Sequence, residues 1–245
     1  MIKIDITFAS SALGRDTSVR VLLPNQKNYP ADHRFPTLYL LHGLTDCADT
    51  WLYRTSLERY CDDFEIAVVL PTAERSFYCD MVYGDSYFTY VGHEVPAVCE
   101  SLLPLVPDDQ HRYIAGNSMG GYGAYKIALK NPGKFAKAAA LSGVLDVNQM
   151  IRDFPEYDRD WMLCFGGNTA PAHEDILEIL PKAEFIPALY QYCGTDDFLA
   201  EGNHRFCELC STLGIPVTTV WEEKGVHGWP YWDPQTLPML KWIVG

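Results

Sequence analysis

The pentapeptide Gly116-Asn117-Ser118-Met119-Gly120 constrains the fold of this chain more than any other part of its sequence. An apolar run at residues 112–115 precedes it, and a helix-like run at residues 122–130 follows it. A G-x-S-x-G turn between a strand and a helix is the pattern of a nucleophile elbow, whose glycines allow a turn too sharp for a β-carbon. Such a turn lifts the serine hydroxyl to its tip, so the sequence predicts a nucleophile at Ser118.

The remainder of the chain alternates between short apolar runs and helix-like segments. Strands are predicted at residues 3–8, 18–23, 37–41, 66–70, 113–116, 136–141, 188–192 and 217–221. Helices are predicted near residues 55–62, 94–103, 120–130, 203–213 and 234–243. Apolar runs without alternation, such as residues 66–70, are typical of parallel strands that are buried on both faces. The order of these elements predicts an α/β fold, with a mostly parallel sheet of about eight strands and helices on both faces.

Residues 144–182 fit no strand–helix unit, and we expect them to form a small cap or a long excursion over the active site. The chain contains no linker-like tract, repeat or low-complexity run, and 48% of its residues are hydrophobic, which is enough for a sizeable core. Residues 1–245 are therefore predicted to form one catalytic domain.

The net charge of −13 argues against nucleic acid or an anionic membrane as a partner, because both repel an acidic surface. The first residues alternate like a strand and lack the apolar region of a signal peptide, and no stretch could span a bilayer. Eight cysteines without a secretion signal suggest reduced thiols, so a cytoplasmic location is expected. The oligomeric state is left open, with a homo-oligomer as one alternative.

No metal site and no cofactor are expected from the motifs of this chain. Cys207 and Cys210 form a lone C-x-x-C pair with only His204 nearby, whereas a zinc site needs a second pair or histidines at ligand spacing. The chain contains no Walker loop, no H-E-x-x-H motif and no dinucleotide-binding fingerprint. The predicted chemistry therefore depends on the side chains of the protein itself.

A serine nucleophile needs a base to take its proton and a third group to orient that base. Where the serine lies on a G-x-S-x-G elbow, the acid and then the histidine follow it along the chain. Asp197 lies on the loop after residues 188–192 and is the favoured acid, with Asp196 and Asp146 as alternatives. His227 is the favoured base, because it follows the last predicted strand and the six other histidines do not.

The oxyanion of a tetrahedral intermediate needs N–H donors beside the nucleophile. One donor is expected from Met119, the residue after the serine, and the other from the loop after the third strand. That loop contains His42-Gly43-Leu44, in which Gly43 allows the turn that would aim the N–H of Leu44 at the site. His42 itself is expected to be a structural residue that forms hydrogen bonds.

Aromatic residues are candidates for the walls of the substrate pocket. Tyr78 and Tyr83 lie on the loop after the strand at residues 66–70, which should reach the catalytic edge of the sheet. Trp51 and Trp229 are further candidates. Most of the aromatic side chains are expected to pack their loops against the protein, and one or two to line an apolar or aryl acyl pocket.

Several stretches of the chain occur in the same order in one known family. They are Leu41-His42-Gly43, Trp51-Leu52-Tyr53-Arg54-Thr55-Ser56, Ser76-Phe77-Tyr78, Glu94-Val95-Pro96, residues 116–124, residues 193–199 and residues 225–229. On these stretches the chain resembles the esterase D family of α/β-hydrolases, which includes S-formylglutathione hydrolases, tributyrin-type esterases of short acyl chains, some feruloyl esterases and the mycolyltransferases. The likeness is greatest to the tributyrin-esterase branch, because residues 42–46 depart from the Ser-Gly-Leu-Thr-Cys pattern of the glutathione-specific branch.

This resemblance implies an α/β-hydrolase fold, a triad of Ser118, Asp197 and His227, and oxyanion donors at Leu44 and Met119. The chain is therefore predicted to be a serine carboxylesterase that hydrolyses small acyl esters, either short-chain or feruloyl, through an acyl-enzyme on Ser118. The alternatives are a thioester hydrolase of the S-formylglutathione type or an acyltransferase with the same triad. A non-catalytic binding protein of the same fold is a further alternative, which the presence of all three residues disfavours.

Overall fold

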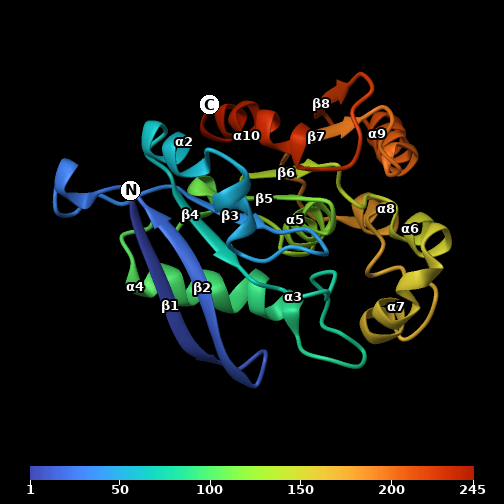
Figure 1. Ribbon diagram of the computed structural model, residues 1–245, viewed down its shortest axis with the longest axis horizontal. Helices are drawn as coiled ribbons and strands as arrows, with labels where there is room; N and C mark the ends of the chain where they lie inside the picture. Colours follow the sequence, from blue (N-terminus) through green and yellow to red (C-terminus); the bar gives the residue numbers. More distant parts are fainter.

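An eight-stranded sheet runs through the centre of the protein, for which a computed structural model describes residues 1–245 (Figure 1). Its strands lie in the order β1-β2-β4-β3-β5-β6-β7-β8. They are β1 Ile2–Ser10, β2 Arg15–Leu23, β3 Thr37–Leu41, β4 Ala67–Pro71, β5 Arg112–Asn117, β6 Lys137–Leu141, β7 Ala188–Gly194 and β8 Val217–Glu222. β2 is antiparallel to both of its neighbours, and β3 to β8 run parallel to one another. All eight predicted strands are confirmed, as is the mostly parallel α/β-hydrolase sheet.

The register of the sheet brings the carboxyl ends of its central strands to one level. Leu41 of β3 lies beside Gly116 of β5, and Asn117 of β5 lies beside Leu141 of β6. Leu141 in turn lies beside Tyr192 of β7. The loops that follow these strands therefore meet at one edge of the sheet, where open α/β sheets bind their ligands.

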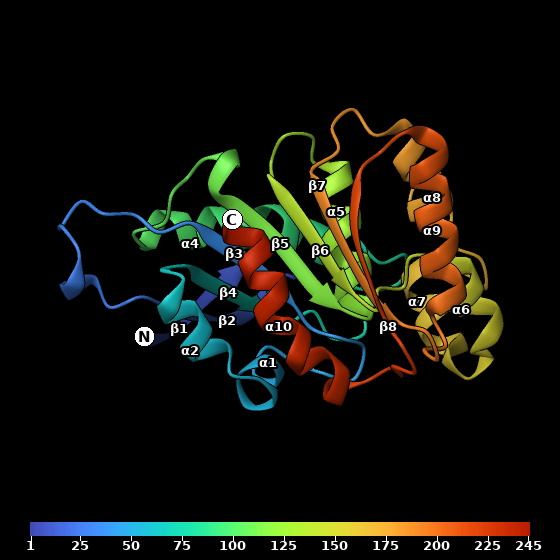
Figure 2. The ribbon, with the colours of Figure 1, turned by 90° about the horizontal axis from the view of Figure 1, so that it is seen from above.

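Helices cover both faces of the sheet (Figure 2). One face carries α4 Val95–Leu102, α5 Met119–Lys130, α8 Ile176–Ile179 and α9 Ala200–Leu213, and the other carries α1 Thr50–Arg54, α2 Leu57–Asp63 and α10 Trp229–Val244. The hydrophobic core is correspondingly divided, with 47 buried residues in the cluster on the α5 side and 19 in the cluster on the α10 side. Every residue of β3, β4 and β5 is buried, which explains why these strands lack alternation.

Three of the five predicted helices are confirmed with small shifts of their ends, and two differ from the prediction. The predicted helix at residues 55–62 is split into α1 and α2, because Thr55 Oγ1 accepts from Leu57 N–H at 3.1 Å and donates to the Trp51 carbonyl at 2.7 Å. These local bonds compete with continuous helix. α10 begins five residues earlier than predicted and contains Pro234 and Pro238 within its length.

Residues 144–182 form an excursion that packs on the body of the protein. It contains α6 Val147–Asp153, a 3-10 turn at residues 155–157, α7 Asp158–Phe165 and α8. The backbone of α7 pairs with the loop after β4, since Tyr83 N–H donates to the Leu163 carbonyl at 3.0 Å. Trp161 is fully buried against Phe77, with their ring centroids 4.8 Å apart. Of the two predicted forms for this segment, the structure has the long excursion.

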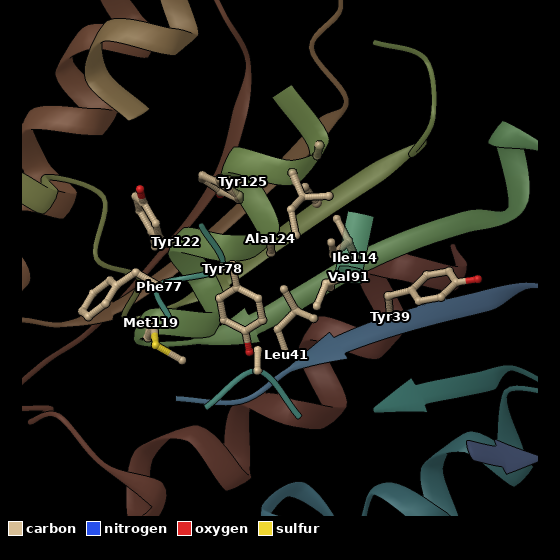
Figure 3. Packing of buried hydrophobic residues seen from close by; sticks show 14 of the residues in the cluster. Tyr39, Leu41, Phe77, Tyr78, Val91, Ile114, Met119, Tyr122, Ala124 and Tyr125 are labelled. Carbon is tan, nitrogen blue, oxygen red and sulfur yellow. The ribbon is translucent and has the colours of Figure 1, made fainter. Parts of the chain in front are cut away.

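The loop after β4 leads through α3 Tyr87–Thr89 and a π-helical turn, Tyr90–Glu94, into α4. Figure 3 shows side chains of this loop, of β3 and of α5 together in the larger core cluster, among them Tyr78, Leu41 and Met119. No helix in the structure combines the length and the apolar character that crossing a membrane requires.

Candidate active site

Ser118 lies on a strained turn between β5 and α5. Its backbone has φ of 54° and ψ of −119°, a conformation that non-glycine residues rarely adopt. A β-carbon on Gly120 would lie 2.4 Å from the Leu41 carbonyl oxygen, and one on Gly116 would lie 2.4 Å from the Gly120 carbonyl carbon. The two glycines therefore let the turn pack against β3. Ser118 N–H donates to the Leu141 carbonyl at 2.9 Å, which fixes the strained residue to β6.

His227 and Asp197 extend from loops after β8 and β7 toward the serine. His227 Nε2 lies 3.0 Å from Ser118 Oγ. The other ring nitrogen, Nδ1, lies 3.0 and 2.9 Å from the two carboxylate oxygens of Asp197. Because a carboxylate only accepts, Nδ1 carries the proton that it donates to Asp197, and Nε2 is left free to accept from the serine hydroxyl.

Of the three candidate acids, Asp197 is the one whose side chain is completely buried. Its side chain is 0% exposed, and its Oδ1 also accepts the Leu199 N–H at 2.9 Å. Asp196 is exposed, and its backbone N–H donates to the Gly225 carbonyl at 3.0 Å. Asp146 caps α6 by accepting from Gln149 N–H at 2.8 Å and forms an ion pair with Arg205 at 2.8 Å. Neither alternative acid therefore contacts His227.

The loop that carries His227 is placed by close packing against the loop that carries Asp197. A β-carbon on Gly194 would lie 2.1 Å from the Gly225 carbonyl oxygen, so glycine is required at this contact. Two aromatic rings then flank the imidazole: Phe198 at 4.3 Å and Trp232 at 4.8 Å between centroids. The His227 side chain is 16% exposed, so these rings limit the access of water to the imidazole.

Two residues near Ser118 are expected to supply the oxyanion donors. Met119 is the first residue of α5, so its N–H has no preceding helical carbonyl to bind. The N–H of Leu44 forms no hydrogen bond within the protein. A β-carbon on Gly43 would lie 3.6 Å from the Ser118 β-carbon, which shows how closely the loop after β3 approaches the nucleophile.

Three buried side chains fix the loop after β3. His42 Nε2 accepts the Ala73 N–H at 2.9 Å, and its Nδ1 faces the Gly43 carbonyl at 2.7 Å, so the ring is neutral and Nδ1 donates. Burial lowers the pKa of His42, which keeps it in this form. Tyr78 Oη donates to the His42 carbonyl at 2.9 Å, and Trp51 Nε1 donates to the Leu41 carbonyl at 3.1 Å.

A cavity of about 370 Å³ opens above the serine. Its lining residues are Gly43, Leu44, Thr45, Asp46, Arg54, Asn117, Ser118, Met150, Tyr157, Phe198, His227, Gly228, Trp229 and Trp232. Of the four aromatic residues predicted as walls, only Trp229 is among them. Trp229 is itself held by Trp51, whose ring centroid lies 4.9 Å away at an interplanar angle of 86°.

Trp51, Tyr78 and Tyr83, predicted as pocket walls, do not line the catalytic cavity. Trp51 and Tyr78 are fully buried, and their polar atoms form the hydrogen bonds that hold the loop after β3. Tyr83 is 62% exposed and lines a different hollow, because the backbone of its loop pairs with α7 rather than crossing the sheet edge.

Four of the hydrophobic lining residues were missed by the sequence reasoning. Phe198 follows Asp197 directly and Trp232 lies five residues after His227, so nearness to the predicted triad was an available signal. Met150 and Tyr157 come from the excursion after β6. Their approach to the serine depends on tertiary packing, which no local pattern records. No cluster of three or more histidine, cysteine, aspartate or glutamate side chains is arranged to hold a metal ion.

Comparisons with known proteins place this geometry in context. The sequence profile of a family described as "Putative esterase" matches residues 10–243. An acetyl esterase of Caldicellulosiruptor saccharolyticus is 30% identical over 259 residues, which cover 97% of this chain and 96% of that protein. Among solved structures, FphF, a fluorophosphonate-binding serine hydrolase of Staphylococcus aureus, is 32% identical with a TM-score of 0.92, covering 100% of this chain and 98% of that one. The S-formylglutathione hydrolase FrmB of Staphylococcus aureus is 33% identical with a TM-score of 0.89, covering 100% and 99%.

Proposed function

This chain belongs to the putative esterase family and is a serine esterase, and we propose that Ser118, His227 and Asp197 form its catalytic triad. The observation that carries the proposal is the continuous series of hydrogen bonds from the serine hydroxyl through both nitrogens of the imidazole to a buried carboxylate. The fully enclosed Asp197 supports the role of an orienting acid. Residues 1–245 act in this proposal as one catalytic domain.

The proposed reaction begins when Ser118 Oγ attacks the ester carbonyl. His227 Nε2 takes the hydroxyl proton, and Asp197 stabilises the imidazolium that forms. The N–H groups of Leu44 and Met119 are the proposed donors to the oxyanion of the tetrahedral intermediate. His227 then returns the proton to the alcohol as it leaves, which yields an acyl-enzyme on Ser118.

Water completes the cycle by attacking the acyl-enzyme. His227 accepts a proton from the water, and the carboxylic acid leaves as the Ser118 hydroxyl reforms. The strained backbone of Ser118 contributes by holding its oxygen at the tip of the elbow throughout. The aromatic flanks of His227 support this role, because exclusion of water strengthens the electrostatic interactions in the site.

Small acyl esters are the proposed substrates. A cavity of about 370 Å³ is at the lower end of the range for ligand sites, which favours a compact acyl group over an extended lipid. The acetyl esterase relative supports a short acyl chain. The aromatic walls Phe198, Trp229 and Trp232 are also compatible with an aryl acyl group.

Replacement of the nucleophile tests this function. We expect Ser118→Ala to abolish hydrolysis of p-nitrophenyl acetate and labelling by a fluorophosphonate probe, with the melting temperature preserved. Asp197→Asn should lower kcat by about 10⁴-fold, because the imidazole would adopt the wrong tautomer. Asp196→Asn is the matched control and should retain wild-type kcat. Turnover by the Ser118→Ala protein at the wild-type rate would disprove the proposal.

Hydrolysis of a small thioester is a second candidate, favoured by the similarity to the S-formylglutathione hydrolase. Comparison of kcat/KM for a glutathione thioester, a p-nitrophenyl ester series and methyl ferulate would rank these substrates. An acyltransferase would be recognised by diversion of the acyl group to an added alcohol.

The proposal extends to the cellular compartment and the oligomeric state of the enzyme. All eight cysteines are free thiols, which supports a reducing compartment such as the cytoplasm. A homo-oligomer is the oligomeric state to test first, by light scattering.

A further inference from the structure

Tyr157 separates two hollows of the protein. It lines the catalytic cavity together with Ser118 and His227. It also lines a second hollow of about 550 Å³, whose other walls come from the loop after β4 and from the start and middle of α7. No other residue lines both spaces. Tyr157 therefore lies between the catalytic cavity and a larger hollow that the proposed mechanism does not use, and we call it the partition.

Neighbouring side chains hold the Tyr157 ring in place. It stacks on Phe154 with centroids 6.1 Å apart and an interplanar angle of 16°, and meets Trp161 edge-on at 6.1 Å. The guanidinium carbon of Arg75 lies 5.2 Å from the ring centroid. Arg75 is itself fixed by two guanidinium nitrogens on the Asp160 carboxylate, at 2.7 to 3.2 Å. The partition is thus a fixed wall.

The Tyr157 hydroxyl forms no hydrogen bond with another group of the protein. Its half-exposed side chain is carried by a single 3-10 turn, Pro155–Tyr157. The residue therefore acts in the cavity through the bulk of its ring. Removal of the ring would leave no buried polar partner unpaired, so the effect of a smaller residue here would be mainly one of space.

We propose that Tyr157 sets the upper size limit of the ester that the enzyme accepts, and that the second hollow is a latent extension of the substrate site. This inference rests on the proposed esterase function of the Ser118 site. A chain that leaves the scissile carbonyl on the side of the excursion meets the Tyr157 ring. Beyond the ring, Met81, Tyr83 and Leu163 provide apolar surface for the end of a longer chain.

The charged groups of the second hollow allow such a chain to enter. Arg75 and Asp160 are paired with each other, and Asp85 is paired with Arg15 at 3.3 Å. Tyr83 lines this space and is 62% exposed. The other charged residues of this hollow, Glu74, Glu156 and Arg159, are exposed and can stay solvated at its rim. An extended alkyl or aryl chain would therefore lie against charges that are either paired or solvated, and Tyr83 is the contact that tests whether it is there.

The experiment compares kcat/KM across two series of esters. In one series the acyl chain of p-nitrophenyl esters lengthens from acetate to octanoate, and in the other the alcohol of acetate esters lengthens from methanol to octanol. For Tyr157→Ala we expect the ratio of octyl to shortest substrate to rise about tenfold or more in one series, which identifies the half of the ester that faces Tyr157. Tyr157→Leu, which keeps more bulk, should show a smaller rise in the same series.

Two controls distinguish the loss of the Tyr157 ring as a barrier from a general loosening of the catalytic cavity. Tyr157→Phe keeps the ring and should keep the wild-type ratios. Tyr83→Ala should leave the ratios of the wild type unchanged, but should reverse most of the gain when it is combined with Tyr157→Ala. Unchanged ratios in both series for the alanine and leucine variants, with acetate still hydrolysed, would overturn this inference alone. An active Ser118→Ala protein would instead overturn the esterase site on which it depends.

Discussion

At the scale of single residues, Lys126 of α5 carries a fully enclosed charge. Its side chain is 0% exposed and forms an ion pair with Glu174, while its Nζ donates to the Phe77 carbonyl at 3.0 Å. Burial alone would raise the pKa of Glu174, but Lys126 outweighs that effect, and the pKa of the carboxyl falls to about 2. The pair links the helix behind the nucleophile to the loop that carries Tyr78 and to the end of the excursion.

Removal of one partner from this pair should be costly. We expect Lys126→Met to lower the free energy of unfolding by about 3–5 kcal/mol, because it leaves the Glu174 carboxylate buried without its main counter-charge. Urea denaturation measures the change. Lys130→Met is the matched control on the same helix: its side chain is 27% exposed and 3.4 Å from Glu174, so about 1 kcal/mol or less is expected. Equal losses for the two variants would show that enclosure of the charge is not the cause.

At the scale of secondary-structure elements, the elbow depends on contact between α5 and β3. A β-carbon on Gly120 would lie 2.4 Å from the carbonyl oxygen of Leu41 and 2.8 Å from that of His42. Both atoms belong to the backbone just before the proposed oxyanion donor Leu44, so neither can rotate away. The same contact that tightens the elbow therefore also sets the position of the loop after β3.

We expect Gly120→Ala to lower stability by about 1–3 kcal/mol or more and to reduce kcat more than KM, since it pushes the loop after β3 away from Ser118. Thermal unfolding and p-nitrophenyl acetate kinetics provide the two readouts. Gly167→Ala is the control, because a β-carbon there meets nothing within 4 Å. A Gly120→Ala protein with wild-type melting temperature and kcat would contradict this account.

The helices and strands also show which features a local sequence pattern can predict. The strands were found because burial on both faces leaves a continuous apolar run, as in β4, and this signal is local. The split of residues 55–62 and the early start of α10 were missed, because a threonine hydroxyl ended one helix and α10 includes prolines that usually mark helix ends. α6 and α7 were missed because their short amphipathic faces pack only against the completed fold.

The candidate site was likewise predicted where a local pattern marks its residues and missed where only the completed fold brings them in. Ser118, Asp197 and His227 were selected because each follows a strand, and parallel strands bring their carboxyl ends together. The structure brings these three side chains into hydrogen-bond contact. The lining residues Met150 and Tyr157 could not be selected, since they lie far from any strand end and reach the cavity only through the path of the excursion.

At the scale of the whole molecule, stability should depend on pH through buried groups. His42 is buried and its pKa is lowered from the ordinary value of 6.5, so it stays neutral in the fold when the unfolded chain takes up a proton. Its contribution is fully present above pH 6.5 and is lost as pH falls toward the lowered pKa. Glu174, with its pKa lowered from 4.5 to about 2, loses its contribution as pH falls from 4.5 to 2.

We therefore expect the urea midpoint to fall in two stages, first below about pH 6.5 and then more steeply below about pH 4.5. His42→Gln should reduce the first stage, because the glutamine does not titrate, and His93, whose pKa is also lowered by burial, keeps the remainder. His204→Gln, at an exposed side chain that forms no ion pair, is the control and should keep both stages. A midpoint that rises on acidification between pH 6.5 and 5 would contradict the assignment of a neutral, buried His42.

The separation of the proposed base from the nucleophile along the chain has a consequence for biosynthesis. Ser118 is translated 109 residues before His227, and the segment that follows His227 is α10, the last helix of the fold. In the proposed mechanism, a polypeptide that ends before His227 contains the serine but lacks its base. We expect no ester hydrolysis from such a truncated polypeptide, so the activity in a cell extract reports only chains that include His227.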